Sequence, residues 1–237
     1  MRFVVAAGGT GSRLLPATLS TNKHLIPCDK QTLMIDYPLR MFRKYGADEV
    51  IVVTGANHAS QIVDYVGDGS RYEYKRVEYA FQPHPKGISD VIKRVMHHKN
   101  MGGVFMVLGD NYFEKMQAVD FYLNRAAAFQ YDIGSLEQAK SFGQITYCPI
   151  DWTKPVDIIE KPTNPNHSKI LTGLYYFPED VFDLVEKLSP SKRNELEITD
   201  LLRLYLEQGR LDVHDVVGEW ADLGEWSSLQ KFWKSRS

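Results

Sequence analysis

The chain has 237 residues but only two cysteines, Cys28 and Cys148. Two cysteines are too few for a disulfide framework or for a zinc site built from cysteines, so we expect free thiols in a reducing compartment. The N-terminus has no cluster of positive charge before an apolar stretch, and no window approaches the roughly 20 apolar residues that a membrane helix needs. The sequence therefore predicts a cytoplasmic protein with no membrane partner.

An excess of positive charge is also absent, because the formal net charge is −2. A protein that wraps DNA or RNA usually carries a basic field, so we expect no nucleic-acid partner. The remaining composition, 43% hydrophobic and 24% charged, is ordinary for a soluble domain. A single α/β domain spanning residues 1–237 is long enough to bury a full core.

Apolar runs alternate with helical patterns through the first half of the chain. The patterns predict strands near 2–7, 49–54, 75–82 and 103–109 and helices near 35–45, 57–66 and 88–99. Such βαβ alternation predicts a Rossmann-like, mostly parallel mixed sheet flanked by helices, with ligands at the carboxyl ends of its strands.

From about residue 131 onward the predicted strands are shorter, near 144–147, 156–159 and 172–176, with turn residues such as Pro155 and Pro162 between them. They predict a smaller β lobe that is inserted or appended without a flexible linker. A helix should follow, with Asn194 as its N-cap, Glu197 as capping partner and Gly209 at its end.

A glycine-rich turn follows the first apolar run, with Gly8, Gly9 and Gly11. Because glycine tolerates positive φ and has no Cβ, such a turn lets backbone N–H groups approach an anion closely. Arg13 and Lys23 add two cations that suit a polyanion such as a nucleoside triphosphate. The segment matches neither a P-loop nor a dinucleotide fingerprint. A turn that only reverses the chain is the alternative.

Residues 8–18 and 22–27 together resemble the signature of the sugar-1-phosphate nucleotidyltransferases, especially the glucose-1-phosphate thymidylyltransferases, with Ser12 in place of the usual threonine. The resemblance spans Val4 to about Leu229. It implies transfer of a nucleotidyl group from a pyrimidine nucleoside triphosphate, dTTP or UTP, to a sugar 1-phosphate such as glucose 1-phosphate. Residues 1–130 would bind the nucleotide and residues 131–237 the sugar phosphate.

The chain ends where the longer thymidylyltransferases continue into a C-terminal helical region. We therefore expect a short form that is a monomer or a small homo-oligomer.

The resemblance implies that the glycine loop, including Ser12, wraps the triphosphate while Arg13 and Lys23 hold the phosphates as pyrophosphate departs. Asp110 and Asp222 would hold Mg²⁺, the expected cofactor. An aspartate directly after a buried strand suits Mg²⁺ beside a phosphate. Taken alone, however, Asp110 also suits a turn, and Asp222 also suits the cap of a helix at 226–233.

The remaining implied site residues bind the base and the sugar phosphate. Gln82 and the Gly87 backbone would read the N3–H and O4 edge of uracil or thymine, although a rotated amide also reads cytosine. Lys161 would aim the attacking phosphate, although a Glu–Lys pair is also common on solvated faces. The full set for the sugar phosphate is Gly143, Glu160, Lys161, Thr172, Gly173 and Arg193.

Two rival functions remain open at the level of sequence. One is a cytidylyltransferase that acts on another phosphorylated acceptor. The other is a sensor that binds nucleotide sugars without turnover.

Overall fold

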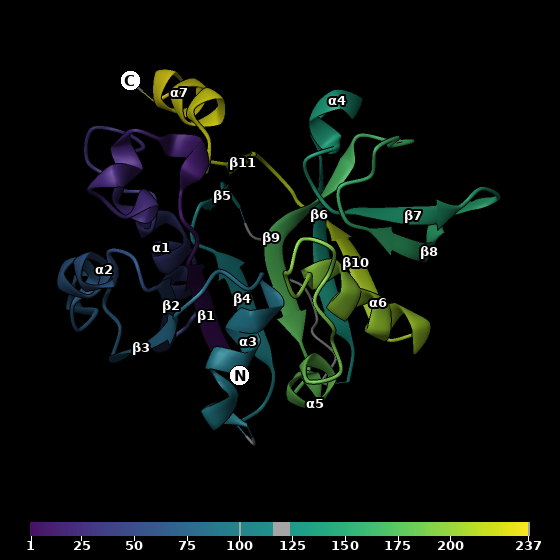
Figure 1. Ribbon diagram of the computed structural model, residues 1–237, viewed down its shortest axis with the longest axis horizontal. Helices are drawn as coiled ribbons and strands as arrows, with labels where there is room; N and C mark the ends of the chain where they lie inside the picture. The colour runs from purple at the N-terminus through teal and green to yellow at the C-terminus, as the bar shows by residue number, and fades with distance from the viewer. Residues whose placement is uncertain (100, 116–123, 237) are drawn as a thin grey trace. The chain divides into compact units, whose positions relative to one another are not determined.

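The computed structural model describes residues 1–99, 101–115 and 124–236 (Figure 1). Their contacts divide the chain into two compact units. Unit 1 consists of Met1–Pro85, a short segment that begins at Val104 and the C-terminal segment from Val217. Unit 2 consists of Lys86–Gly103 and the long segment that ends at Val216. The units interleave along the chain, and a single nucleotidyltransferase domain divided near residue 130 stays a prediction.

Unit 1 contains four parallel strands in the order β4-β1-β2-β3. Their bounds are β1 Arg2–Ala7, β2 Glu49–Gly55, β3 Arg76–Gln82 and β4 Val104–Leu108. β1, β2 and β4 are almost continuously buried and apolar, as expected for parallel strands covered on both faces. Ala6 pairs with both Val53 and Leu108, so the strands end at the same edge.

Unit 1 also contains helices, a second, antiparallel pair of strands and several 3₁₀ turns. They are the helices α1 Asp36–Lys44, α2 Ala59–Val66 and α7 Trp226–Lys234, the antiparallel pair of β5 Asn111–Phe113 and β11 Trp220–Asp222, and the 3₁₀ turns Ser12–Leu14, Ala17–Leu19, Lys23–Leu25 and Ser70–Tyr72. A buried cluster joins the N-terminal turns to the C-terminal segment; its members are Leu14, Ile26, Cys28, Met34, Leu223, Leu229 and Phe232. Apolar burial thus fastens the ends of the chain together.

Unit 2 contains three strands in the order β10-β6-β9, with β10 parallel and β9 antiparallel to β6. A separate hairpin is formed by β7 and β8. The strands are β6 Ala126–Asp132, β7 Gln144–Cys148, β8 Asp151–Ile159, β9 Lys169–Phe177 and β10 Leu211–Asp215. The helices are α3 Ser89–Arg94, α4 Leu136–Ala139, α5 Val181–Val185 and α6 Ile198–Glu207, with a 3₁₀ turn at Met96–His98.

The predicted fold class, a mostly parallel mixed sheet flanked by helices, is confirmed, and the predicted strands and helices of unit 1 agree with the observed ones to within about two residues. Cys28 and Cys148 are free thiols, as expected. None of the helices in the described residues combines the length and the apolar character that crossing a membrane requires.

Three predictions from the sequence are wrong. Pro155 lies inside β8, opposite Tyr147 at a register shift, because a hairpin edge tolerates a residue without an N–H donor. The helix predicted near 88–99 ends at Arg94, before the turn Met96–His98. Asn194 does not begin a helix, since α6 starts only at Ile198.

The segment before α6 is extended because the backbone of Leu196 bonds with a neighbouring segment. The Leu196 N–H donates to the Lys86 carbonyl at 2.7 Å, and the Ser89 N–H donates to the Leu196 carbonyl at 3.1 Å. A helix starting at Asn194 would break both hydrogen bonds. Glu197, predicted as capping partner of Asn194, is instead the residue before the helix.

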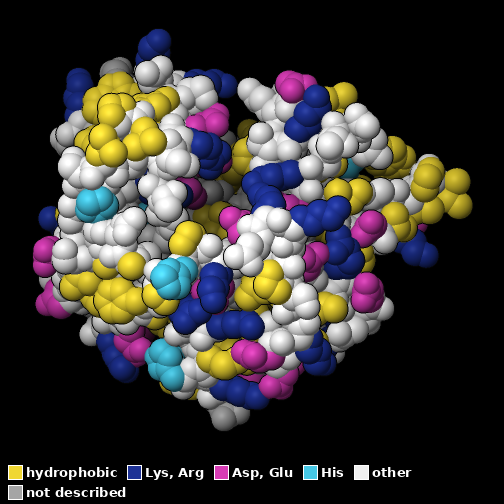
Figure 2. Space-filling model, viewed as in Figure 1, with side chains coloured by type: hydrophobic (Ala, Val, Ile, Leu, Met, Phe, Trp, Pro, Cys, Tyr) yellow, Lys and Arg dark blue, Asp and Glu magenta, His cyan; other side chains and the backbone are white. Residues whose placement is uncertain are grey.

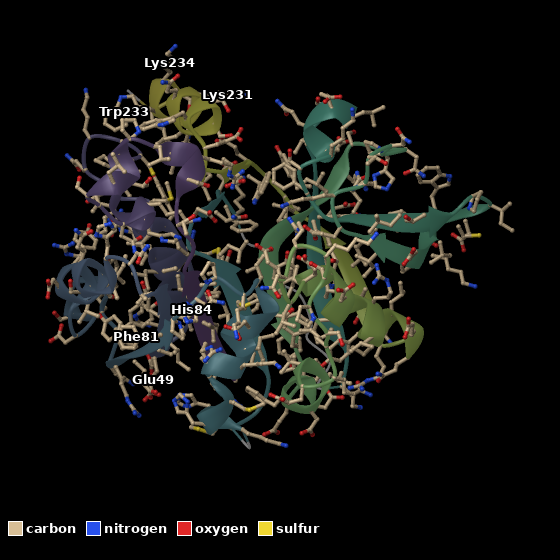
Figure 3. All side chains as sticks on the ribbon, viewed as in Figure 1. Glu49, Phe81, His84, Lys231, Trp233 and Lys234 are labelled. Atoms are coloured by element: carbon tan, nitrogen blue, oxygen red, sulfur yellow. The ribbon has the colours of Figure 1, made fainter. Side chains whose placement is uncertain are left out.

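The surface carries an exposed apolar hairpin tip and a pair of lysines at the end of α7. Apolar side chains gather at the tip of the β7–β8 hairpin, where Ile150 and Trp152 are exposed (Figure 2). Lys231 and Lys234 project from the last turn of α7, where cations suit the helix dipole (Figure 3).

Gly87 lies between Lys86 and Ser89, and the hydrogen bonds of these two residues with Leu196 depend on it. It has a φ of +92°, and a Cβ atom there would lie 2.4 Å from the Leu196 carbonyl oxygen. Gly134 also has a positive φ, +66°, but a Cβ there meets nothing within 4 Å. We expect Gly134→Ala to cost about 1 kcal/mol of unfolding free energy and Gly87→Ala about 3 kcal/mol or more. Urea unfolding measures both, and equal losses would contradict the steric explanation.

Candidate functional site

The glycine loop of unit 1 lies at the carboxyl edge of the parallel strands. Gly8 follows β1 directly, and a Cβ atom there would lie 2.9 Å from Gln82 Oε1. Gly11 has a φ of +67° and precedes the turn Ser12–Leu14. Its carbonyl accepts a hydrogen bond from the Thr18 hydroxyl at 2.8 Å, which fixes the loop's return. The predicted loop residues therefore form one compact turn beside the ends of β2 and β3.

Two cations flank this loop. Lys23 begins the turn Lys23–Leu25, and its Nζ donates to Asp110 Oδ2 at 2.6 Å. Arg13 lies in the turn Ser12–Leu14, and its Nη1 is 3.7 Å from both Asp222 Oδ2 and Glu225 Oε2. The Arg13 side chain is 53% exposed, whereas that of Lys23 is 14% exposed. Arg13 is thus the more accessible of the two to an incoming anion.

The two predicted metal carboxylates are brought together by backbone pairing. Asp110 comes just before β5 and Asp222 ends β11, which pairs antiparallel with β5. The Leu223 N–H donates to the Asp110 carbonyl at 2.8 Å, and the Gly224 N–H donates to Asp222 Oδ1 at 2.9 Å. Asp222 therefore binds the chain two residues before α7 and does not cap that helix.

Gly224 lies against both carboxylates. A Cβ atom there would lie 2.9 Å from Asp110 Oδ2 and 3.0 Å from Asp222 Oδ1, with Arg13 Nη2 at 3.2 Å. The two oxygens thus converge on one small space that any larger residue would fill. Two convergent carboxylate oxygens are the donors that Mg²⁺ prefers, so these residues fit a divalent cation.

The buried carboxylates of Asp110 and Asp222 repel each other, and their pKa values are shifted in opposite directions. Burial, and next the Asp110 charge, raise the pKa of Asp222 to about 6, although Arg13 opposes the shift. Burial alone would raise the pKa of Asp110, but the Lys23 charge and the hydrogen bonds to its carboxylate hold that pKa below its usual range. Burial and the Lys23 charge lower the pKa of neighbouring His24 to about 3, which keeps this imidazole neutral.

Gln82, predicted to read the base, lies at the end of β3 and is buried. It lines a pocket together with Gly9, Thr10, Gly55, Ala56, Asn57, Pro83 and Pro85. Because the glycines have no side chain and the prolines have compact rings, the Gln82 amide is the longest polar side chain in this lining. The sequence analysis missed the contribution of Asn57 and its neighbours, which follow β2 at the same carboxyl edge.

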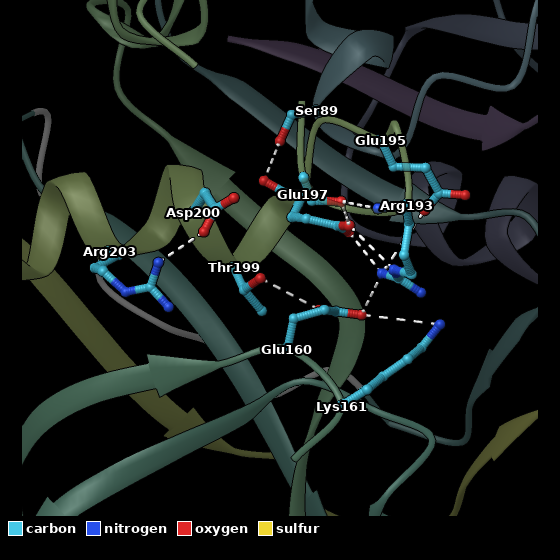
Figure 4. A network of polar contacts seen from close by, with 10 residues as sticks. Ser89, Glu160, Lys161, Arg193, Glu195, Glu197, Thr199, Asp200 and Arg203 are labelled. Carbon is cyan, nitrogen blue, oxygen red and sulfur yellow. Dashed lines mark hydrogen bonds and ion pairs between the residues drawn. The ribbon is translucent and has the colours of Figure 1, made fainter. Parts of the chain in front are cut away.

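Two predicted sugar-phosphate residues of unit 2, Lys161 and Arg193, lie beside a third, Glu160, which follows β8 (Figure 4). Glu160 Oε1 accepts from Arg193 Nη2 at 2.9 Å, and Oε2 accepts from the Thr199 hydroxyl at 3.3 Å. Lys161 Nζ lies 3.9 Å from Glu160 Oε1. Burial, and next the charge of Glu197, raise the pKa of Glu160.

Arg193 is shared by several carboxylates. Its Nε and Nη2 donate to the two oxygens of Glu197 at 3.2 and 2.7 Å, in addition to the bond with Glu160 (Figure 4). The Ser191 hydroxyl also donates to Glu197 at 2.6 Å. The nearly buried Glu197 carboxylate therefore holds the guanidinium in place.

The other predicted residues of unit 2 are held mainly by contacts with the backbone and with neighbouring side chains. The Thr172 hydroxyl donates to the Phe129 carbonyl at 2.8 Å, and Gly173 follows it inside β9. A Cβ atom at Gly143 would lie 2.8 Å from Thr199 Cγ2 and 3.4 Å from Glu160 Oε2. Gly143 thus lies beside the Glu160 carboxylate. Gly87, predicted to act with Gln82, packs against Leu196 within unit 2.

Sequence reasoning missed two polar residues beside the carboxylates of unit 1. Asn111 Nδ2 donates to Asp110 Oδ1 at 3.1 Å, and Trp220 Nε1 donates to Asn111 Oδ1 at 2.8 Å. In unit 2 it missed Thr199 and the clamping role of Glu197. The signal was available for Asn111, since it directly follows the predicted metal aspartate, but its partner Trp220 is distant in sequence.

Comparison with known proteins identifies the family. Residues 3–235 match the family model described as nucleotidyl transferase. The chain is 32% identical to a glucose-1-phosphate thymidylyltransferase of Neisseria meningitidis, over 98% of this chain and 81% of the relative. It is 34% identical to the enzyme of that name from Actinoplanes, over 94% of this chain and 74% of the relative. A solved Bacillus anthracis structure assigned as a glucose-1-phosphate thymidylyltransferase, in complex with a sucrose, is 29% identical with a TM-score of 0.86 and covers 98% of this chain and 93% of that one.

The raised pKa of Asp222 predicts a measurable cost in stability. An acid whose pKa rises from 3.8 when unfolded to about 6 when folded destabilises the fold increasingly as pH rises through this window. We expect Asp222→Asn to raise the free energy of unfolding by about 3 kcal/mol at pH 8, and the gain to fall to about 0.5 kcal/mol at pH 4 and to vanish at lower pH. Denaturant unfolding at several pH values measures this. A gain independent of pH, or a loss at pH 8, would contradict the assignment.

Proposed function

The chain belongs to the nucleotidyl transferase family and is an enzyme of sugar-1-phosphate nucleotidyl transfer, and we propose that it joins a pyrimidine nucleotide to glucose 1-phosphate. The nucleotide donor in this proposal is dTTP or UTP, and the products are an NDP-sugar and pyrophosphate. Mg²⁺ is the proposed cofactor. The observation that carries the proposal is the convergence of Asp110 and Asp222 beside the glycine loop, with Lys23 and Arg13 next to them.

The nucleotide half of the proposal rests on unit 1. Backbone N–H groups of the loop at Gly8, Gly9 and Gly11 suit phosphate oxygens, because positive φ, as at Gly9 and Gly11, is typical of anion-binding backbone turns. The pocket around Gln82 suits a single pyrimidine ring, whose edge an amide can pair with. Mg²⁺ bound by Asp110 and Asp222 would neutralise charge on the phosphates.

The sugar-phosphate half rests on unit 2. The Glu160 carboxylate is oriented by Arg193 and Thr199 and suits hydroxyl donors of a sugar. Lys161 is half exposed and its Nζ lies 3.9 Å from Glu160 Oε1, beyond hydrogen-bond distance, so its ammonium is available to a phosphate. Gly143 gives the sugar ring room beside Glu160.

The proposed reaction needs no general base. The phosphate oxygen of a sugar 1-phosphate is already anionic, so it attacks the α-phosphorus of the nucleotide directly, the bond to the β-phosphate breaks, and pyrophosphate leaves with the electron pair. Catalysis then consists of positioning and charge neutralisation. Lys161 orients the attacking oxygen, while Arg13 and Lys23 hold the leaving phosphates.

The test is turnover with defined substrates. Purified protein is incubated with Mg²⁺, each nucleoside triphosphate including dTTP, and a panel of sugar 1-phosphates, and pyrophosphate release is measured. We expect turnover with dTTP and UTP and glucose 1-phosphate. Preference for CTP would favour a cytidylyltransferase with another acceptor. Binding of nucleotide sugars without any turnover would favour a sensor.

Arg13 should act mainly on the rate. Negative charge on pyrophosphate grows as it leaves, so Arg13→Ala should lower kcat by about 100-fold while nucleotide affinity changes much less. Steady-state kinetics separates kcat from KM. Arg76→Ala, which removes an exposed arginine of unit 1, is the control and should behave as wild type. A raised KM with unchanged kcat would make Arg13 only an anchor for bound phosphate.

Gln82 should act on the choice of base. We expect dTTP and UTP to differ by only about tenfold, since one methyl group in an apolar contact contributes little more than about 1 kcal/mol, and purines to be excluded by the size of the pocket. Gln82→Ala should reduce discrimination against CTP without changing the dependence on Mg²⁺. Phe81→Ala is the control, because that neighbouring side chain is 52% exposed (Figure 3). Equal discrimination in wild type and Gln82→Ala would remove Gln82 from base recognition.

A further inference from the structure

We propose that Asn111 is a positioning residue that fixes the Asp110 carboxylate for its metal, and that Trp220 sets the direction in which Asn111 acts. This inference rests on the proposed function, in which Asp110 and Asp222 hold a divalent cation. It adds two residues that the motif-based assignment of the site does not contain.

The contacts form a relay with a defined direction. Trp220 Nε1 carries a hydrogen and has no acceptor lone pair, so the group that it meets at 2.8 Å must be the carbonyl oxygen of the Asn111 amide. The NH₂ end of the same amide therefore points the other way and donates to Asp110 Oδ1 at 3.1 Å. The indole thus decides that Asn111 presents a donor, and not an acceptor, to the carboxylate.

The relay is buried and lies on a rigid pair of strands. Trp220, Asn111 and Asp110 are all less than 9% exposed. Trp220 and Asn111 lie on β11 and β5, and Asn111 is the backbone partner of Asp222. One short ladder therefore carries the amide, its indole donor and the second metal carboxylate. Inside such a ladder a rotated amide would set two acceptor oxygens against each other, Asn111 Oδ1 and Asp110 Oδ1.

The hydrogen bond from Asn111 also determines where the second oxygen of Asp110, Oδ2, points. With Oδ1 bound by Asn111, the carboxylate plane is fixed and Oδ2 faces Lys23 Nζ and the space at Gly224, where Asp222 Oδ1 also lies. Hydrogen bonds of this kind orient metal ligands, and their loss typically weakens metal affinity by about 10- to 100-fold. Asn111 therefore acts on the metal through Asp110 without touching it.

A matched control exists in unit 2. There Tyr147 donates its hydroxyl to Gln130 Oε1 at 2.9 Å, and Gln130 Nε2 donates to Asp215 Oδ1 at 3.0 Å. This second relay has the same chemistry, an aromatic donor, a buried amide and an aspartate, but it belongs to unit 2, whereas both proposed metal carboxylates belong to unit 1. Loss of Gln130 therefore reports the structural cost of removing a buried amide.

The experiment titrates Mn²⁺ into the full chain and follows free Mn²⁺ by electron paramagnetic resonance. We expect Asp110→Asn to abolish tight binding, Asn111→Leu to raise the dissociation constant by about 10-fold or more, Trp220→Phe to raise it by a smaller factor, and Gln130→Leu to leave it unchanged. Trp220→Phe keeps the aromatic shape, so it remains informative if Asn111→Leu does not fold.

A second readout follows the relay itself. In a spectrum of indole N–H groups, the Trp220 resonance, identified by its loss in Trp220→Phe, should shift on addition of Mg²⁺ in wild type but not in Asp110→Asn.

Each outcome decides one question. Mn²⁺ binding that Asn111→Leu and Trp220→Phe leave intact, while Asp110→Asn abolishes it, would overturn the positioning role and keep the metal site. Equal losses in Asn111→Leu and Gln130→Leu would make the amide merely structural and also overturn that role. Binding that Asp110→Asn leaves intact would remove the metal site from the proposed function, and the inference with it.

Discussion

Two like charges held close together are the constraint on which the site in unit 1 depends. Asp110 and Asp222 are far apart in sequence, yet their oxygens converge at Gly224. Such a pair is unfavourable alone, as the raised pKa of Asp222 indicates. The Lys23 ammonium at Asp110 and the Arg13 guanidinium near Asp222 offset the repulsion. Lys23 and Arg13 are also the groups that suit phosphates. The stability of the protein without ligand and its affinity for a polyanion therefore depend on the same two side chains.

Apolar packing and backbone pairing supply the energy that keeps these charges together. Leu14 and Leu223 belong to one buried cluster, so the turn that carries Arg13 is fastened to the segment that carries Asp222. In unit 2 neighbouring carboxylates are likewise offset by a cation, since one guanidinium, that of Arg193, lies among several of them (Figure 4). Glu197 anchors that guanidinium from the start of α6, and Glu160 is oriented by it.

Local patterns predicted the parts of the site that depend on a strand and the residues just after it. The glycine loop after β1 and Asp110 after β4 follow from parallel strands ending at a common edge. Contacts between distant segments were not predictable in this way. The Leu196 backbone bonds with the segment of Lys86 and Ser89, which overrides a reasonable capping pattern at Asn194. β6 was missed because its alanine-rich start, Ala126–Ala128, favours helix by propensity, whereas pairing with β9 and β10 decides its conformation.

The most direct test of the carboxylate pair as a cation site is a crystal structure of the protein with Mn²⁺ and dTTP, read by anomalous scattering. The account predicts one strong anomalous peak at coordination distance, about 2.2 Å, from an oxygen of Asp110 and an oxygen of Asp222, with Lys23 moved off Asp110 toward the phosphates. A bound nucleotide whose Mn²⁺ lies away from both carboxylates, with the Lys23 to Asp110 contact unchanged, would contradict it.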